Sequence, residues 1–186
     1  MKRIISILVL AALTITSCGT INAANLSDGI IPNGNIKNAD VTEAGEVIAD
    51  FGVRLLRESI DEKNTLISPL SVLSALAMTA SGADGDTLTQ MEAVLGMDIE
   101  SLNAYIKAYT DALASGEKYK LSLANSIWFT DDTRFTVNDD FLQTNADYYG
   151  ADIYKAPLDR STRDDINNWV KDRTDGMIPK IIDEIP

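Results

Sequence analysis

The sequence predicts an α+β domain in which several helices pack around the strands of a large mixed or antiparallel sheet. Residues 70–80 are apolar on every side, interrupted only by small polar residues, and such a helix is stable only when other elements cover it. Residues 119–129 alternate between apolar and polar side chains, which is the period of a half-buried strand. A strand of this length implies a large sheet.

Apolar residues at helical spacing predict the other helices. Residues 42–60 carry one apolar stripe, and residues 100–114 carry another that includes Tyr105 and Tyr109, which we interpret as core residues rather than as a binding platform. Shorter helices are expected at residues 87–95 and 141–149, and one more begins at Ser161 or Thr162 and ends at Gly176. Short strands are expected at residues 65–67 and 151–158.

The turns between these elements have their own signals. Ser68 is suited to cap the helix that begins with Pro69, whose missing N–H costs nothing in the first helical position. Gly82 suits the left-handed position after that helix, and a capping box at Thr87 and Gln90 starts the next one. The turn between the two helices is therefore expected to be short and fixed.

The N-terminus has the form of a bacterial lipoprotein signal. Lys2 and Arg3 precede an apolar run, residues 4–15, that is too short to span a bilayer. Ile15-Thr16-Ser17-Cys18 resembles a lipobox, in which the cysteine is acylated and becomes the mature N-terminus. We expect residues 1–17 to be removed, Cys18 to carry the lipid, and the chain to be exported and anchored to a membrane at the cell surface or envelope. A plain signal peptide with an incidental cysteine is the alternative.

Residues 18–42 are predicted to form a flexible tether, because they are small and polar and show no sustained period. The domain would then occupy residues 43–186.

Composition excludes several classes of enzyme. The chain has no histidine and one cysteine, which removes Ser-His and Cys-His nucleophiles and thiolate metal sites. The formal net charge of −12 argues against nucleic acid as a partner. The acidic pairs at residues 131–132, 139–140 and 164–165 lie at predicted turns and helix starts and lack the spacing of a calcium loop. We expect no catalytic residue, no metal and no cofactor.

Three segments resemble the serpin family. Asn64, Ser68-Pro69-Leu70-Ser71 and Gly82-Ala83-Asp84-Gly85-Asp86-Thr87 resemble the family's Asn, Ser-Pro-x-Ser and Gly-Ala-x-Gly-x-Thr elements. Residues 123–128 are similar to its Leu-Ala-Asn-x-Ile-Trp strand, and residues 166–178 to its Ile-Asn-x-Trp-Val and Thr-x-Gly-x-Ile run. The resemblance covers about residues 43–186 and corresponds to the N-terminal half of a serpin.

The resemblance implies inhibition of serine or cysteine peptidases by cleavage and insertion of a reactive loop, but that loop is not in these 186 residues. It also implies that Asn64, Ser68 and Ser71 lie beneath the point where the main sheet opens. Alternatively, Ser68 is only a helix cap and Ser71 a buried hydroxyl bonded to its own helix. The alternative function is that of a truncated or non-inhibitory surface interaction protein, and an envelope hydrolase is disfavoured.

Overall fold

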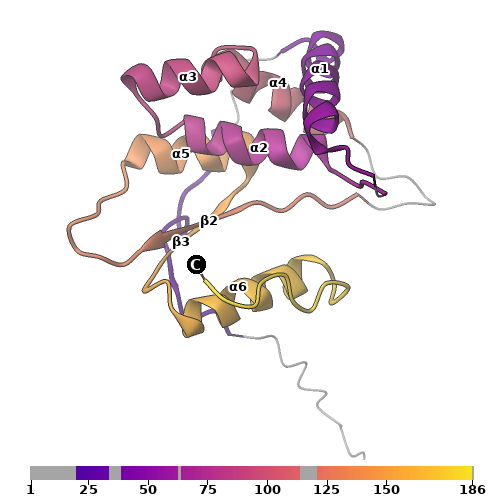
Figure 1. Cartoon of the computed structure of the whole chain (residues 1–186). Coiled ribbons are helices and arrows are strands. Elements are labelled where there is room, and N and C mark those ends of the chain that lie inside the picture. Colours follow the sequence, from indigo (N-terminus) through magenta and orange to yellow (C-terminus); the bar gives the residue numbers. More distant parts are fainter. Residues whose placement is uncertain (1–19, 34–38, 63, 114–120, 186) are drawn as a thin grey trace, which may run out of the picture.

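The structure, a computed structural model, describes residues 20–33, 39–62, 64–113 and 121–185. Six helices and three short strands lie within these residues. Helices α1 to α5 lie on one side of the sheet and α6 lies on the other (Figure 1). The bounds are β1 Ala24–Asn25, α1 Val41–Ser59, α2 Pro69–Ala80, α3 Gly85–Leu95, α4 Ile99–Ala112, β2 Ser126–Thr130, α5 Asp139–Tyr149, β3 Asp152–Ala156 and α6 Arg160–Arg173.

The sheet is mixed, with the strand order β1-β3-β2. Strand β1 pairs antiparallel with β3, so that Ala24 lies opposite Lys155. Strand β2 is parallel to β3, with Ser126 opposite Asp152. A parallel pair needs a crossover, and α5 supplies it. The α+β prediction is confirmed, but the described sheet is small.

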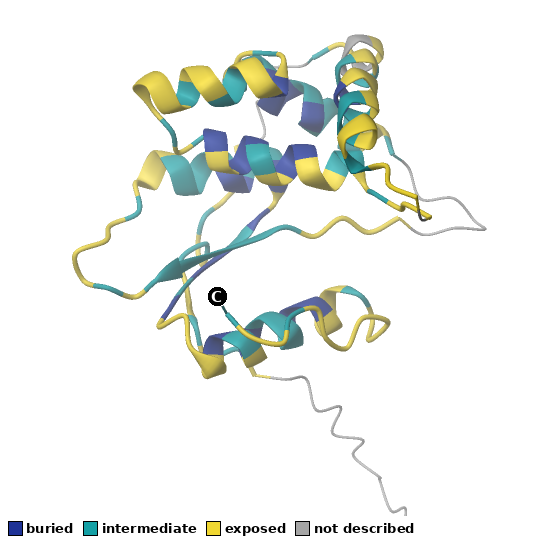
Figure 2. Ribbon diagram, in the orientation of Figure 1, coloured by how far each residue is buried: buried dark blue, intermediate teal, exposed yellow. Residues whose placement is uncertain are grey.

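Helix α2 lies at the centre of the main core, as its all-round apolar sequence predicts. It contacts α1, α3, α4 and α5, and its residues Leu73 and Ala77 are fully buried. The dark blue residues in Figure 2 gather on α2 and on the helix faces turned toward it. Ile153 of β3 joins this core from the sheet.

A second, smaller core covers the opposite face of the sheet. Because side chains alternate along a strand, Tyr154 points away from Ile153 and packs with Trp169 and Val170 of α6. Trp128 of β2 stacks on Tyr154 with 4.4 Å between ring centroids. The indole N–H of Trp169 donates to Asp152 (2.7 Å). Helix α6 is therefore held to the sheet by aromatic packing and by hydrogen bonds.

The caps of two helices differ from the prediction. The sequence predicts a capping box at Thr87, but α3 begins at Gly85, where the Asp84 carboxylate accepts from the backbone N–H (2.8 Å). Asp159 caps α6 by accepting from the N–H of Ser161 (2.7 Å). Aspartate is as good a cap as serine or threonine, so each helix starts at the earlier residue.

The predicted strands are shorter than expected or missing. The long strand predicted for residues 119–129 is confirmed only from Ser126 onward, residues 121–125 are not in a strand, and residues 119–120 lie outside the described residues. Residues 65–67 do not form a strand, and the side chain of Leu66 is 99% exposed. A strand needs a continuous backbone ladder with a neighbour, and no described strand forms one with residues 65–67 or 121–125, although the carbonyl of Asn125 accepts from the N–H of Asp152.

Residues 20–33 lie against the domain, unlike the flexible tether that the sequence predicts. The buried carboxylate of Asp165 accepts from the backbone N–H groups of Asn22 (3.0 Å) and Ala23 (2.9 Å). Asn33 donates to Asp147 of α5 through its backbone N–H (2.7 Å). Most of these bonds use backbone N–H groups, which every residue type except proline supplies, and so the segment has no sequence signature. We call residues 20–33 the N-terminal strap.

No helix among the described residues is both long and apolar enough to cross a lipid bilayer.

Gly82 is required for close packing and not, as the sequence predicts, for a left-handed turn, because its φ is not positive. A Cβ atom on Gly82 would lie 2.9 Å from two ring carbons of Phe141 on α5. Gly45, inside α1, has no heavy atom within 4 Å of the corresponding position. Gly45 is therefore a control position for Gly82, because an added methyl group meets a neighbouring side chain only at Gly82.

We expect Gly82→Ala to lower the free energy of unfolding by about 1–3 kcal/mol, because the methyl group must displace the Phe141 ring. The control Gly45→Ala should raise the stability by about 0.5–1 kcal/mol, because alanine favours the helix. Urea unfolding of both variants measures the effect. Equal stability of the two variants would show that the contact between α2 and α5 is loose.

Candidate functional site

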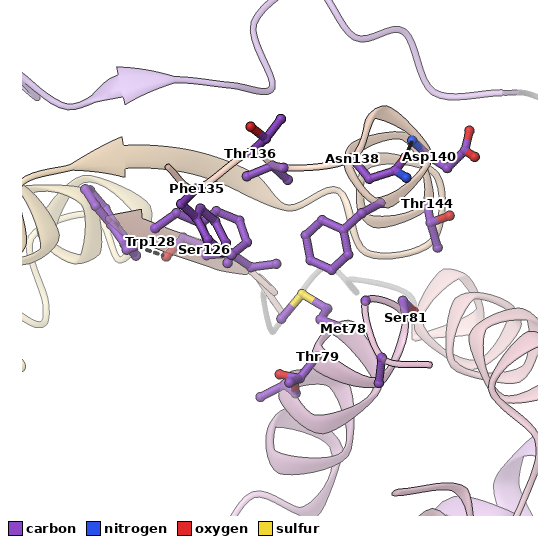
Figure 3. Close-up of a pocket in the computed structure, with 17 residues that line it drawn as sticks. Met78, Thr79, Ser81, Ser126, Trp128, Phe135, Thr136, Asn138, Asp140 and Thr144 are labelled. Carbon is purple, nitrogen blue, oxygen red and sulfur yellow. Dashed lines mark hydrogen bonds between the residues drawn. The ribbon is translucent and has the colours of Figure 1, made fainter. Parts of the chain in front are cut away.

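A cleft of about 750 Å³ lies between β2 and the C-terminal end of α2. Figure 3 shows Met78 and Thr79 of α2 on one side of it and Phe135 and Trp128 on the other. Other residues that line it come from β2, from the segment after β2 and from the start of α5, namely Ser126, Ile127, Phe129, Thr136, Val137, Asn138, Asp140, Phe141 and Thr144.

Aromatic residues form one wall of this cleft. The ring of Phe129 lies 5.2 Å from that of Phe135 and 5.9 Å from that of Phe141, the latter edge to face. Such arrangements are favourable beyond the area that they bury. The wall is apolar, and its rings come from β2, from the segment between β2 and α5, and from α5 itself. Because the rings contact one another, the wall is a preformed surface.

The outer edge of β2 borders the cleft. The backbone N–H of Asp152 donates to the carbonyl of Asn125, and the N–H of Asp131 donates to the carbonyl of Ala156, both at 2.9 Å. In a parallel ladder alternate residues of one strand bond to the same neighbour. Residues 125, 127, 129 and 131 therefore face β3, and residues 126, 128 and 130 direct their N–H and C=O groups outward. No described strand pairs with this outer edge.

A buried hydrogen-bond network supports the cleft from below. The hydroxyl of Tyr149 on α5 donates to the side-chain oxygen of Asn103 on α4. The amide of Asn103 donates to the hydroxyl of Ser81 (3.2 Å), a residue of the cleft wall. Burial raises the pKa of Tyr149, so its hydroxyl keeps the proton that it donates. The network therefore ties α4 and α5 to Ser81, the residue that follows α2 and lines the cleft.

Sequence reasoning missed Asn103, although a signal was available. Asn103 follows Leu102 on the apolar stripe of α4 and is buried with it. A polar residue on a buried face must find a partner, and here the partners come from two other helices.

The resemblance places Asn64, Ser68 and Ser71 beneath the point where the main sheet opens, which we call the shutter role, and the structure brings two of these three residues together. The hydroxyl oxygens of Ser68 and Ser71 lie 2.8 Å apart and both residues are exposed. Ser68 occupies the N-cap position of α2, but its side chain makes no capping hydrogen bond. Ser71 is not the buried hydroxyl of the alternative interpretation. The shutter role of these serines and of the exposed Asn64 stays a prediction, and Cys18 lies outside the described residues.

The acidic pairs have structural partners. Asp132 bonds to Arg134, which holds the pKa of that carboxyl below its usual range. Asp139 and Asp140 lie in the first turn of α5, where negative charge is stabilising. Asp165 binds the N-terminal strap. In the part of the chain that the structure describes, no three acidic side chains gather in a way that could hold a metal ion.

The fold and the cleft thus define an α+β scaffold with an apolar surface beside an open sheet edge. The family model "Serpin (serine protease inhibitor)" matches residues 46–186. This chain belongs to the serpin family, whose members are protease inhibitors and not enzymes.

Individual relatives and a solved structure support the same family membership. The chain is 37% identical over 136 residues to the leukocyte elastase inhibitor of Equus caballus and 35% identical over 140 residues to that of Sus scrofa. Each match covers 69% of this chain and 35% of the relative. The crystal structure of the thermophilic serpin tengpin in its native state is similar with a TM-score of 0.80 and 52% identity, covering 88% of this chain and 43% of that one. This chain therefore spans less than half the length of these relatives.

We expect Tyr149→Phe to lower the free energy of unfolding by about 1–2 kcal/mol, because a buried acceptor on Asn103 loses its donor. Tyr109→Phe is the control, since the half-buried hydroxyl of Tyr109 has no hydrogen-bond partner among the described residues. Chemical unfolding of both variants gives the comparison. If the two substitutions changed the free energy of unfolding equally, the Asn103 network would contribute nothing to stability.

Proposed function

We propose that this chain forms the N-terminal part of a serpin-type inhibitor of serine or cysteine peptidases, and that a lipid on Cys18 holds it at the surface of the cell. Membership of a family described as serine protease inhibitors is the observation that carries the proposal. Two relatives that are at least 35% identical are leukocyte elastase inhibitors by name. The chain spans 35% of their length, so the loop that a peptidase cleaves would come from the remaining part of the fold.

The chemistry of the proposed inhibition belongs to the peptidase. Its serine or cysteine attacks the scissile carbonyl of the loop, the amine side of the loop leaves, and the acyl bond to the peptidase remains. Insertion of the cleaved loop as a strand of the sheet then deforms the peptidase before water reaches that bond. The part of this chain in that process is to supply strands and the helical core behind them.

The role of the helical core can be stated from the contacts. Helix α2 packs on four other helices and forms one side of the cleft. The Asn103 network fixes the end of α2 against α4 and α5. A rigid support of this kind lets strands be added at the sheet edge while the helices behind it keep their packing.

The test of inhibition uses protein purified from membranes of the source cells. We expect a complex with at least one member of a panel of serine and cysteine peptidases that survives denaturing gel electrophoresis, because an acyl bond joins the two chains. The same peptidase with its nucleophile replaced by alanine is the control and should give no such complex. Degradation by every active peptidase would instead favour a non-inhibitory interaction protein.

The test of anchoring uses the Cys18→Ser variant. We expect it to lose the mass of the acyl chains and to move from the membrane fraction to the soluble fraction, because the thiol that carries the lipid is gone. Ser17→Ala is the control, since it keeps a small residue before the cysteine. A wild-type protein whose intact mass shows no acyl chain would contradict the anchor.

A further inference from the structure

We infer that the N-terminal strap holds the start of α6 against the lipid surface to which Cys18 is attached, so that the turn at residues 157–160 contacts the membrane. Helices α1 to α5, which lie on the other side of the sheet, then face away from the membrane (Figure 1). The inference rests on the lipid anchor of the proposed function, and it adds the face of the domain that meets the bilayer. We call residues 157–160 the α6 turn.

The strap leaves almost no free chain between the lipid and the domain. Ile21 and Ala23 pack against the smaller core with α6, and the backbone N–H groups of Asn22 and Ala23 donate to Asp165. Only three residue steps separate Cys18 from Ile21. Because an extended chain covers about 3.3–3.6 Å per residue, the lipidated residue lies within about 11 Å of Ile21.

A free tether would set no such limit. If residues 18–42 were a flexible coil, the ends of that coil would lie about 25–30 Å apart on average, and the domain could turn any face to the bilayer. The contacts of the strap remove this freedom from residue 21 onward. The strap therefore selects the face that lies beside the lipid.

That face is the start of α6. Asn22 borders a hollow of about 390 Å³ together with Pro157 and Ser161, which lie on either side of the beginning of α6. From there the strap pairs with β3 and continues to α5, where Asn33 donates to Asp147 (Figure 1). The end of the strap that leads to the lipid is thus the end at the α6 turn, and the other end lies at the helices.

Leu158 supplies an independent observation at the same place. Its side chain is 38% exposed and belongs to neither of the two described cores. Its φ is +54°, a left-handed conformation that costs free energy for a residue with a Cβ atom. The α6 turn therefore presents an apolar side chain to the outside in a strained backbone. Such a side chain is unfavourable in water and favourable in the boundary region of a bilayer.

Charge does not explain the contact. Residues 159–165 contain two arginines and three aspartates. Arg163 bonds to Asp164 (2.9 Å), and the Asp159 carboxylate caps α6. The start of α6 is therefore not basic, and the whole chain is acidic, so anionic lipid would not attract it. We expect the contact to form on zwitterionic lipid and to be insensitive to salt.

A dye on α6 tests the contact. Because the thiol of Cys18 carries the lipid, Arg160→Cys gives the acylated chain a single free thiol, and Gln90→Cys on α3 is the control. Both residues are exposed. Each full-length lipoprotein is produced in the source cells, labelled, and placed in phosphatidylcholine vesicles that carry a nitroxide on the headgroup. We expect the nitroxide, which quenches only at close range, to quench the dye at residue 160 about fivefold more than that at residue 90, at low and high salt alike.

A longer tether tests the role of the strap. Insertion of twenty glycine and serine residues between Gly19 and Thr20 changes no described residue, and it adds an average reach of about 25 Å. We expect quenching at residue 160 to fall to the level at residue 90. Unchanged quenching at residue 160 would overturn the role of the strap.

Leu158→Asn tests the α6 turn in the chain that carries the dye at residue 160. Asparagine tolerates the left-handed conformation but is polar, so the backbone is retained while the apolar contact is lost. We expect the quenching to fall about twofold, because the turn no longer enters the boundary region of the bilayer. Unchanged quenching would overturn the contact of Leu158 with lipid.

The remaining outcomes separate this inference from the proposed function. Acylated protein with equal quenching at residues 160 and 90, or with stronger quenching at residue 90, would overturn the inference and leave the anchor standing. An intact mass without acyl chains would overturn the anchor and the inference together. Peptidase inhibition is measured separately, and its absence would leave the contact with the membrane unaffected.

Discussion

The described fold depends on the two-sided pairing of β3. It is the one strand among the described residues with a neighbour on each side, β1 on one edge and β2 on the other. Both faces of β3 are also buried, because the side chain of Ile153 lies in the main helical core and that of Tyr154 lies in the smaller core with α6. Removing β3 would separate α6 from helices α1 to α5, whereas the N-terminal strap would keep its bond from Asn33 to Asp147 of α5. The five residues of β3 therefore join parts of the chain that otherwise share few contacts.

The contrast between β3 and β2 explains how one sheet can be both rigid and open. Strand β2 is anchored on one side by the parallel ladder and on one face by Phe129, which contacts two other phenylalanines. Its position is thus set without any contribution from its outer edge. A preformed edge spares a partner the entropy of ordering that strand, and this favours association.

The helices could be predicted from the sequence because their signals are local. The apolar residues of α2 and the stripe of α1 follow from a period of 3.6, and the structure confirms both helices to within a residue or two. The strands could not, because a strand is defined by its neighbour. Residues 121–125 and 65–67 have strand-like sequences, but no described strand forms a ladder with them. The cleft could not be predicted from the sequence either, because its lining combines residues of α2, β2 and α5, which are far apart in the chain.

The N-terminal strap has a consequence for the order in which the molecule assembles. Its contact with Asp165 joins residues 143 positions apart, and that between Ser27 and Ile153 joins residues 126 positions apart. Forming a contact of this span costs loop-closure entropy before any hydrogen bond stabilises it. The first described segment to leave the ribosome must therefore wait until α6 has been made. Closure of the strap is a late event, because its bonding partners at residues 147, 153 and 165 must all have been made first.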